Sequence, residues 1–428
     1  MENKLLHTPE GVRDIYEREC AGKLAIQDKI HKQFHLYGYR DIQTPTFEFF
    51  DIFSKERGSV GTKEMFKFFD RDNNTLVLRP DMTPSIARCV AKYYLDETMP
   101  IRLCYLESAF INNTSYQGRL KESTQTGVEL IGDDSSDADA EMIALVIASL
   151  KASGLEEFQV ELGQVDFFRG LLEEAGMEEE VQEQLRELIE NKNFFGVEGL
   201  LSTLRIDESL KQAFLKLPQF FGPIEQIRQA RTMTANPRAL HAIDRLEKVQ
   251  EILDIYGLGD YISYDLGMLS KYSYYTGIIF KAYTYGTGDY IVTGGRYDKL
   301  LVQFGKDASA IGFAIEVDKL LQALSRQKIE IPVDMVKTMI LYQKSARAGA
   351  ICLADHFRNQ GMAVQMVRTD PERDIDDYLE FAGRSHIRNV LIMSEDGREM
   401  QIMDLVQNHI SQLALTDYVE SVESQEGI

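Results

Sequence analysis

Apolar residues near the start of the chain recur every three or four positions, which is the spacing of one face of an α-helix. The repeat runs through "ERECAGKLAIQDKIHKQFHL" at residues 17–36. Its apolar members are Leu24, Ile26, Ile30, Phe34 and Leu36. Gly38 follows shortly after the repeat, where a helix commonly ends in a glycine. The pattern predicts a first helix over residues 17–36.

Three later stretches have the pattern of β-hairpins, in which two β-branched or aromatic runs flank a turn. The turn signal is "DRDNN" in residues 63–80 and "GTGD" in residues 274–298. The remaining pair joins "IRLCYLESAF" at 101–110 to "TQTGVELIG" at 124–132 through a polar loop. Residues 133–154 begin with serines and aspartates and continue as an apolar run, so they predict a helix.

The pattern changes twice farther along the chain. Residues 166–255 consist of helical segments with no convincing strand between them. After a linker near residues 326–335, residues 336–428 alternate strand and helix, as small α/β domains do. We therefore expect an α+β fold with a core at 1–165 and 256–325, a helical insertion at 166–255 and a C-terminal α/β domain at 336–428.

Composition narrows the range of partners. The 428 residues carry 47 Lys and Arg against 68 Asp and Glu, a formal net charge of −21, which disfavours whole-molecule attraction to nucleic acid. The first residues lack a signal-peptide pattern, and no apolar run approaches the roughly 18 residues that a membrane span needs. We expect a cytoplasmic protein without a membrane partner.

The cysteines and histidines give weak signals for metal. None of the four cysteines stands in a Cys-x-x-Cys pair, which fits a reducing compartment. His31 and His35 lie four residues apart and would share a helix face, but no third ligand is close in sequence. The sequence therefore predicts no metal and no cofactor.

Polar side chains share one face of the strand in "TQTGVELIG". Because alternate residues of a strand point the same way, Gln125 and Glu129 lie on either side of Gly127. A glycine inside a strand is typical of a place where another group approaches the backbone, so this face resembles a slot for a small ligand with donor groups. The alternative is an outward polar face beside a buried Val-Leu face.

Two further segments could contribute to such a slot. Asp81 and Thr83 share a face in "LRPDMTPS", where Asp81 could accept hydrogen bonds from an ammonium group or could form an ordinary Asx turn or helix cap. Tyr272, Tyr274 and Tyr275 could line a polar pocket or could pack in the core with only their hydroxyls reaching a partner.

These segments, in this order, resemble the catalytic core of class II aminoacyl-tRNA synthetases and, within that class, the histidyl-tRNA synthetase branch. The likeness covers residues 8–160 and 256–325. "TPEGVRDI" resembles the opening segment, "YGYRDIQTPTFE" motif 1, and "LRPDMT" the loop that holds the amino acid's ammonium group. "GRLKESTQTGVELIG" resembles motif 2, "YYTG" the histidine-specific segment, and "GGRYDKL" with "AIGFAIEVDKL" the approach to motif 3.

The resemblance implies a fold and a ligand. The fold is an antiparallel sheet flanked by helices, with a C-terminal domain of the type that binds anticodons. The residues that would form a histidine slot are Asp81, Thr83, Gln125, Glu129, Tyr274 and Tyr275. The first three would face the ammonium group, Glu129 and Tyr274 would face the imidazole, and Tyr275 would line the wall. A carboxylate and a phenol can satisfy both imidazole nitrogens.

The chain departs from the synthetase pattern where that family carries arginines. Ile111 stands at the head of motif 2, Ser270 stands before the tyrosine pair, and Lys319 stands in motif 3 beside Glu316. Amino-acid activation gathers negative charge on phosphoryl oxygens, which positioned cations must stabilise. We therefore expect no catalytic residues and no activation of the amino acid. Arg119 remains a candidate anion contact, although a solvated loop cation is the alternative.

A synthetase-like body with a histidine slot and without those cations resembles the regulatory subunits of ATP phosphoribosyltransferase. "LRPDMTPSIAR" resembles that family in particular. The resemblance implies a non-catalytic subunit that assembles with a short-form catalytic subunit for the first step of histidine biosynthesis and its feedback inhibition by histidine. It also implies a homodimer through the motif 1 region. A divergent histidyl-tRNA synthetase, and a free-standing histidine sensor or RNA-binding module, stay as alternatives.

Overall fold

The computed structural model describes residues 4–54, 60–113, 120–269, 274–333 and 336–414. The chain divides into two compact units, Met1–Pro332 and Val333–Ile428. Each unit has its own sheet and its own buried clusters of apolar side chains. None of the helices within the described ranges is both long and apolar enough to cross a membrane.

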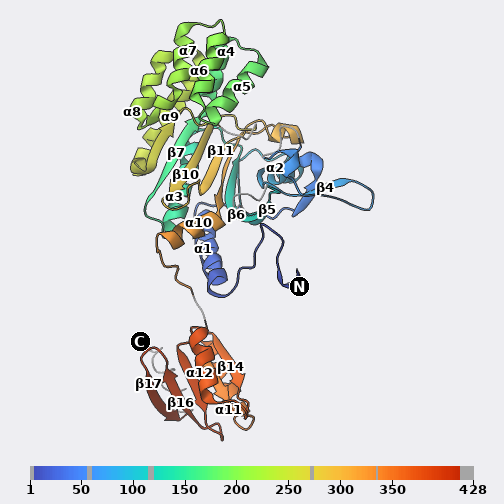
Figure 1. The fold of residues 1–428 in the computed structure, drawn as a ribbon, viewed down its shortest axis with the longest axis vertical. Helices are drawn as coiled ribbons and strands as arrows, with labels where there is room; N and C mark the ends of the chain where they lie inside the picture. Colours follow the sequence, from blue (N-terminus) through green and yellow to red (C-terminus); the bar gives the residue numbers. More distant parts are fainter. Residues whose placement is uncertain (1–3, 55–59, 114–119, 270–273, 334–335, 415–428) are drawn as a thin grey trace. The chain divides into compact units, whose positions relative to one another are not determined.

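The larger unit is organised around a nine-stranded sheet within the described residues, in the order β1-β5-β6-β12-β11-β10-β7-β9-β8. Figure 1 labels β5, β6, β7, β10 and β11 of this sheet. Its strands are β1 (Arg40–Asp41), β5 (Ile101–Phe110), β6 (Glu122–Ile131), β7 (Phe158–Gln164), β8 (Phe221–Gly222), β9 (Ile262–Asp265), β10 (Ile278–Thr284), β11 (Val292–Arg296) and β12 (Ala310–Glu316). Pairing is antiparallel except at β1–β5 and β7–β9. The sheet is therefore mixed, and the α+β prediction is confirmed.

Different helices cover the two faces of this sheet. The helices are α1 (Glu17–Leu36), α2 (Thr83–Tyr93), α3 (Ser136–Ala152) and α10 (Val317–Arg326). Side chains of α1, α3 and α10 are buried with Val128 and Leu130 of β6, whereas α2 is buried with Tyr105 of β5 and the tyrosines near β10. Consecutive residues of β6 thus enter two different clusters of side chains.

The first helix ends as its sequence predicts. α1 spans Glu17–Leu36, and Gly38 takes a left-handed φ of +82° that turns the chain out of the helix. Ile26, Ile30 and Phe34 are fully buried. Leu24 and Leu36 are exposed, so the buried stripe is narrower than the apolar repeat.

The three predicted hairpins are confirmed as antiparallel pairs, β3–β4, β5–β6 and β10–β11. The strands β2 (Phe47–Phe49), β3 (Lys67–Phe69) and β4 (Thr75–Leu78) form a separate small sheet in the order β2-β4-β3. The loop after β4 leads directly into α2 and carries Asp81.

Helices dominate residues 166–255. They are α4 (Val165–Ala175), α5 (Glu179–Glu190), α6 (Phe194–Thr203), α7 (Glu208–Lys216), α8 (Ile224–Arg228) and α9 (Pro237–Ile255). The expectation of no strand in this stretch is wrong, because Phe221–Gly222 forms β8 and pairs with β9. Two residues cannot show a two-residue period, so the sequence pattern carried no signal for β8.

The smaller unit has a five-stranded sheet in the order β14-β13-β15-β16-β17 within the described residues. Its elements are β13 (Thr338–Tyr342), α11 (Arg347–Asn359), β14 (Val364–Arg368), α12 (Ile375–Arg384), β15 (Asn389–Met393), β16 (Glu399–Asp404) and β17 (His409–Ala414). The predicted alternation of strand and helix holds as far as β15. The antiparallel pair β16–β17 then extends the sheet, which the sequence pattern had not indicated.

Candidate functional site

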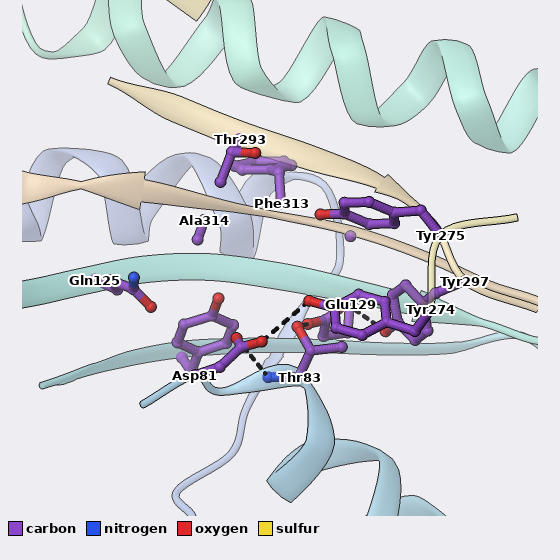
Figure 2. A pocket seen from close by; sticks show the side chains of 12 residues that line it. Asp81, Thr83, Gln125, Glu129, Tyr274, Tyr275, Thr293, Tyr297, Phe313 and Ala314 are labelled. Atoms are coloured by element: carbon purple, nitrogen blue, oxygen red, sulfur yellow. Dashed lines mark hydrogen bonds between the residues drawn. The ribbon is translucent and has the colours of Figure 1, made fainter. Parts of the chain in front are cut away.

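One pocket in the larger unit gathers all six residues of the predicted slot (Figure 2). Its empty volume is about 370 Å³, counting the space that is open to solvent. The lining residues are Asp81, Thr83, Tyr105, Gln125, Glu129, Tyr274, Tyr275, Thr293, Tyr297, Gly312, Phe313 and Ala314.

Strand register places the polar side chains in this pocket. On β6, Gln125 and Glu129 fall on the same face, and that face points into the molecule. The neighbouring strand β12 sets Gly312 beside Glu129 and Glu316 beside Gln125. The alternative of an outward polar face is therefore wrong, since only 1% of Glu129 is exposed.

Glu129 is the most deeply buried acid of the pocket. Thr83 Oγ1 donates to its Oε1 at 2.7 Å, and the Tyr297 hydroxyl donates to its Oε2. Burial raises the pKa of Glu129 to about 8, while the hydrogen bonds from Tyr297 and Thr83 offset part of that rise. The nearby Asp81 carboxylate raises it further. Glu129 can therefore change its protonation state near neutral pH when a ligand arrives.

The glycine of the predicted slot has a different role from the expected one. A Cβ at Gly127 would lie 2.1 Å from the backbone oxygen of Phe313 and 2.6 Å from the Tyr105 hydroxyl. The groups that approach Gly127 are therefore the Phe313 carbonyl and the Tyr105 ring, not a ligand. This ring comes from the opposite residue on β5 and is buried.

Tyrosines form one wall of the pocket. The Tyr274 hydroxyl donates to Asp81 Oδ2 at 3.0 Å. The Tyr274 ring lies edge-on to the Tyr275 ring at 5.0 Å and to the Tyr297 ring at 6.0 Å between centroids. Asp81 also accepts from the backbone N–H of Thr83 at 3.3 Å, so its Asx turn and its position in the pocket occur together. The two interpretations of Asp81 were not exclusive.

Gln125 connects the pocket to a second acid, the half-buried Glu316. Its Nε2 donates to Glu316 Oε1 at 2.8 Å, and burial raises the pKa of Glu316. Gln125 Oε1 is buried and, in the described part of the chain, has no hydrogen-bond partner. Burying an acceptor without a donor costs free energy. The Gln125 Oε1 atom therefore indicates a ligand that brings N–H groups.

The charge of the pocket has one sign. None of the described residues that line it is Lys, Arg or His, whereas Asp81 and Glu129 are acids. Glu316 adds a third carboxyl group through Gln125. The arrangement can hold a cationic or donor-rich molecule, and its described lining offers a phosphate no cation.

Where the synthetase pattern has arginines, the described positions of this chain hold an isoleucine and an ion-paired lysine. Ile111 is half-buried, and its backbone N–H donates to the carbonyl of Lys121 at 2.9 Å. Lys319 pairs with Asp289 at 2.7 Å and lies over the Tyr290 ring at 4.3 Å. Ser270 and Arg119 lie outside the described residues, as does Tyr272.

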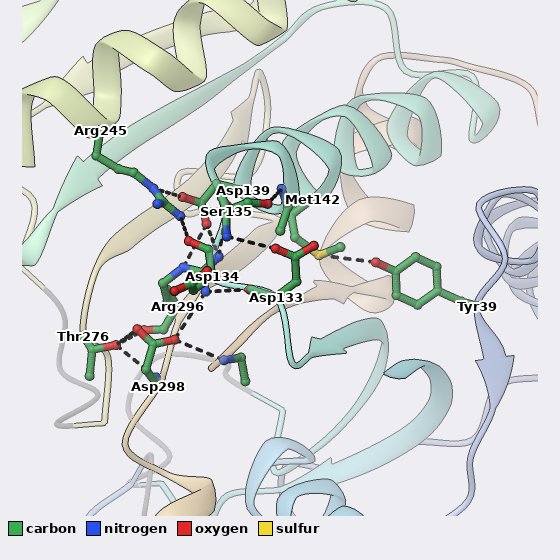
Figure 3. Close-up of polar contacts among 12 residues, drawn as sticks. Tyr39, Asp133, Asp134, Ser135, Asp139, Met142, Arg245, Thr276, Arg296 and Asp298 are labelled. Atoms are coloured by element: carbon green, nitrogen blue, oxygen red, sulfur yellow. Dashed lines mark hydrogen bonds and ion pairs between the residues drawn. The ribbon is translucent and has the colours of Figure 1, made fainter. Parts of the chain in front are cut away.

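A buried ion-pair cluster anchors the segment that carries the tyrosines (Figure 3). Arg296, at the end of β11, donates to Asp139 of α3 at 2.6 Å, and Arg245 of α9 donates to the same carboxylate at 2.6 Å. Thr276, next to Tyr275, donates its backbone N–H to the Arg296 carbonyl at 2.7 Å. The Thr276 hydroxyl lies 3.0 Å from Asp298. The tyrosine wall is thus tied to α3 and α9.

Sequence reasoning missed half of the pocket lining. The missed residues are Tyr105, Thr293, Tyr297, Gly312, Phe313 and Ala314. Tyr297 lies within the quoted "GGRYDKL" segment and was available as a signal. The others depend on which residues of β5, β11 and β12 stand opposite β6, and this register is not visible within any one segment.

The sequence of this chain is similar to those of known proteins along most of its length. Residues 11–320 match the family model of histidyl-tRNA synthetase. The ATP phosphoribosyltransferase regulatory subunit of Acetivibrio thermocellus is 39% identical over 97% of this chain and 99% of its own length. The protein of the same name from Ruminiclostridium cellulolyticum is also 39% identical, over 94% of this chain and 96% of its own.

Solved structures give the same result. A crystal structure described as an ATP phosphoribosyltransferase regulatory subunit/histidyl-tRNA synthetase, from Bacillus halodurans, superposes with a TM-score of 0.82 at 33% identity, covering 91% of this chain and 98% of that one. The histidyl-tRNA synthetase of Nostoc sp. PCC 7120 superposes with a TM-score of 0.80 at 18% identity, covering 98% and 99% of the two chains. At that identity the second likeness shows the fold alone.

Proposed function

The chain belongs to the family of ATP phosphoribosyltransferase regulatory subunits, which is built on the histidyl-tRNA synthetase fold, and from this membership we propose its function. It is a regulatory subunit of ATP phosphoribosyltransferase, required for the first step of histidine biosynthesis and for feedback inhibition of that step by histidine. Its partner is a short-form catalytic subunit. The chain itself carries no catalytic residues for this step.

The observation that carries this proposal is the one-signed charge of the pocket. ATP brings several negative charges, which the Asp81 carboxylate would repel, as would Glu129 and the adjoining Glu316 in their ionised forms. The described lining has no cation to offset this repulsion. A free histidine brings an ammonium group and imidazole N–H groups, which acids attract. A protein with this pocket is suited to binding the amino acid and poorly suited to activating it.

We infer that histidine occupies the pocket with its ammonium group toward Asp81 and Gln125. The orphaned Oε1 of Gln125 would accept one ammonium hydrogen. At the other end, Glu129 already accepts from Thr83 and Tyr297, and a carboxylate has room for a further donor. An imidazole N–H would take that place, with Tyr274 and Tyr275 against the ring.

Loss of aminoacylation is part of the proposal. Removing one donor to a developing oxyanion commonly costs about 3–4 kcal/mol, so three such losses would leave negligible activation. Ile111 has no polar side-chain atom, and Lys319 is engaged by Asp289. Ser270 cannot replace an arginine, and Arg119 is the remaining candidate anion contact in the motif 2 loop.

We also propose that two copies of the chain associate through the motif 1 region. β2 and β3 present aromatic side chains to solvent, with Phe47 53%, Phe49 55% and Phe69 69% exposed. Phe47 and Phe68 pack edge to face at 5.8 Å between centroids. Large exposed apolar groups gathered on one small sheet are typical of an interface.

We propose that two further parts of the chain are distinct from the synthetase-like core. Residues 166–255 would be an insertion into the core, and residues 336–428 a separate domain resembling those that bind anticodons. Their contacts in the complex are not assigned.

Reconstitution with a short-form catalytic subunit tests the main proposal. The purified chain should raise the formation of phosphoribosyl-ATP, and histidine should suppress the increase. The Glu129→Gln variant, which keeps the shape of the side chain, should still raise formation but should need more histidine for inhibition. Equal inhibition of Glu129→Gln and the parent chain by histidine would contradict the proposal that histidine binds in this pocket. No association of the two chains at micromolar concentrations would contradict the proposed partner.

The alternative function is a divergent histidyl-tRNA synthetase, which the family model and the motif order favour. That function requires histidine-dependent exchange between ATP and pyrophosphate. We expect none from the correctly folded chain. Histidine binding in calorimetry without either activity would point to a free-standing sensor.

A further inference from the structure

A second cluster of chemically active side chains lies away from the pocket, at the edge strand of the large sheet. It consists of His31 and His35 on α1, Asp41 on β1 and Cys104 on β5. One potential ligand atom from each residue lies within 4.8 Å of those of the other three. The sequence pattern had indicated only the two histidines. The expectation that no third ligand is close in sequence is wrong, because Asp41 lies only six residues after His35. Cys104 is far away along the chain.

The fold explains why these residues meet. The histidines are one turn apart and face the same side of α1. Gly38 ends the helix and returns the chain as β1, which pairs in parallel with β5 and sets Asp41 directly beside Cys104. The C-terminal part of α1, with His31 and His35, therefore lies next to Asp41 of β1.

The distances in the cluster converge on one carboxylate. His31 Nε2 lies 2.5 Å from Asp41 Oδ1, and His35 Nε2 lies 3.1 Å from Asp41 Oδ2. Cys104 Sγ lies 3.5 Å from Asp41 Oδ1. The two imidazole rings are 4.3 Å apart between centroids. In a tetrahedral zinc site, bond lengths of about 2.0–2.3 Å put neighbouring ligand atoms roughly 3.3–3.7 Å apart, so only small side-chain shifts separate the two arrangements.

We propose that His31, His35, Asp41 and Cys104 form a binding site for one divalent transition-metal ion, with Zn²⁺ as the occupant. Two imidazoles, a thiolate and a carboxylate are the ligand types that zinc accepts, and their number completes a tetrahedron. A closed set of four protein ligands suits a structural ion that fastens the end of α1 to the sheet edge. Asp41 belongs to the motif 1 region, through which we propose self-association. The proposed metal site does not depend on the proposed function.

A cluster of ion pairs without metal is the competing explanation. Surface histidines pair with aspartates without further purpose, and Asp41 is 59% exposed. The histidine pairs alone do not include the fully buried Cys104, whose thiol lies within hydrogen-bond distance of the same carboxylate and adds the sulfur ligand of a zinc site. The exposed side of the cluster, where His35 is 45% exposed, gives an ion a path to the site.

Cobalt substitution tests the site in the full-length chain. After removal of bound metal with a chelator, Co²⁺ should produce visible bands of tetrahedral coordination and a thiolate-to-cobalt charge-transfer band in the near ultraviolet. Zn²⁺ should displace the cobalt at one ion per chain. Octahedral cobalt spectra without a thiolate band would overturn the proposal and leave ion pairs only.

Matched variants identify the ligands. Cys104→Ser should abolish the charge-transfer band, whereas Cys352→Ser, at an exposed cysteine, should retain it. Persistence of the band in a folded Cys104→Ser protein would overturn the proposal.

Because Cys104 is buried, its variant could fail to fold, and a helix-surface variant makes the test independent of it. Loss even of a group behind a metal ligand weakens binding about 10- to 100-fold, so His31→Asn should weaken Co²⁺ binding at least that much. His241→Asn, on α9, should bind as the parent does, and unchanged binding by His31→Asn would overturn the proposal. Circular dichroism checks that each variant is folded.

Discussion

The carboxylate of Glu129 occupies the space that a side chain at residue 312 would need. A Cβ at Gly312 would lie 1.8 Å from Glu129 Oε2 and 2.5 Å from the backbone oxygen of Val128. The two residues stand opposite each other on β6 and β12. The absence of a side chain on one strand therefore fixes where the acid of the neighbouring strand can lie.

Gly312→Ala should consequently damage the pocket. Overpacking of this kind costs about 1–3 kcal/mol, and relief of the clash requires Glu129 to move away from Thr83 and Tyr297. We expect weaker histidine binding in calorimetry and a lower midpoint in urea unfolding. Gly199→Ala in α6 is the matched control, because its Cβ would meet no atom within 4 Å. Histidine binding by Gly312→Ala that equals that of the parent would contradict the assigned position of Glu129.

The buried acid should make stability depend on pH. The pKa of Glu129 is about 8 in the folded protein, against an ordinary value of 4.5, so between these values the folded chain holds a proton that the unfolded chain has lost. The contribution of Glu129 to stability is full below about pH 4.5 and is lost as the pH rises toward 8, by up to about 1.4 kcal/mol per pH unit.

Glu129→Gln removes this titration. The difference in unfolding free energy between the parent and the variant should therefore change across that pH range, while exposed Glu156→Gln should keep the slope of the parent. Urea titrations from pH 5 to about 8 give the comparison. Parallel pH profiles for the parent and Glu129→Gln would show that Glu129 is ionised throughout.

Ligand binding should release a proton for the same reason. A histidine N–H or cation favours the ionised form of Glu129, so binding near pH 7 should lower its pKa. Calorimetry in buffers of different ionisation enthalpy measures the released proton. Glu129→Gln should show less release, and equal release from both proteins would assign the proton elsewhere.

The buried ion pairs behind the tyrosine wall should be important for stability. Asp139 is fully buried and receives both Arg296 and Arg245, so Asp139→Asn leaves two guanidinium groups without their carboxylate. Breaking a buried pair costs about 3–5 kcal/mol. Asp28→Asn, which breaks a pair between two exposed side chains at 3.9 Å, should change the unfolding free energy by less than about 1 kcal/mol. Similar losses in the two variants would contradict the anchoring role.

Self-association should depend on the exposed aromatic side chains of β2. The double variant Phe47→Ser and Phe49→Ser should shift the mass measured by light scattering from dimer toward monomer. Phe195→Ser removes a ring that is 91% exposed on α6 and should leave the mass unchanged. A monomeric mass for the parent chain at micromolar concentration would contradict the proposed dimer.

Restoring a single arginine should not restore catalysis. Ser270→Arg leaves Ile111 without a polar group and Lys319 paired with Asp289, so we expect no exchange between ATP and pyrophosphate. An established histidyl-tRNA synthetase assayed alongside provides the positive control. Detectable exchange from this single variant would contradict the account of lost activation.

The sequence revealed those parts of the fold and pocket that are local in the chain. The helix at 17–36 and the three hairpins have periodicity and turn signals within one segment, and the structure has them where they were expected. The six slot residues were named because they belong to short motifs in a recognisable order. Motif order carries information about distant segments that periodicity does not.

The missed features depend on contacts between distant segments. Tyr105 fills the space at Gly127, and only the pairing of β5 with β6 reveals this. Cys104 lies beside His31, His35 and Asp41 only because β1 lies parallel to β5. The strand β8 is too short for any period. Each of these features follows from register or topology, which no single segment of sequence contains.

The polar groups of the pocket already hold one another in place. Thr83 and Tyr297 fix Glu129, Tyr274 fixes Asp81, and Gln125 is fixed by Glu316. A ligand entering such a preorganised site has little ordering entropy to overcome at these seven residues. Under the proposed function, histidine binding is therefore not signalled by the ordering of these side chains. We expect the signal to reach a catalytic partner as a small displacement of whole strands and helices, or as a change in charge at Glu129.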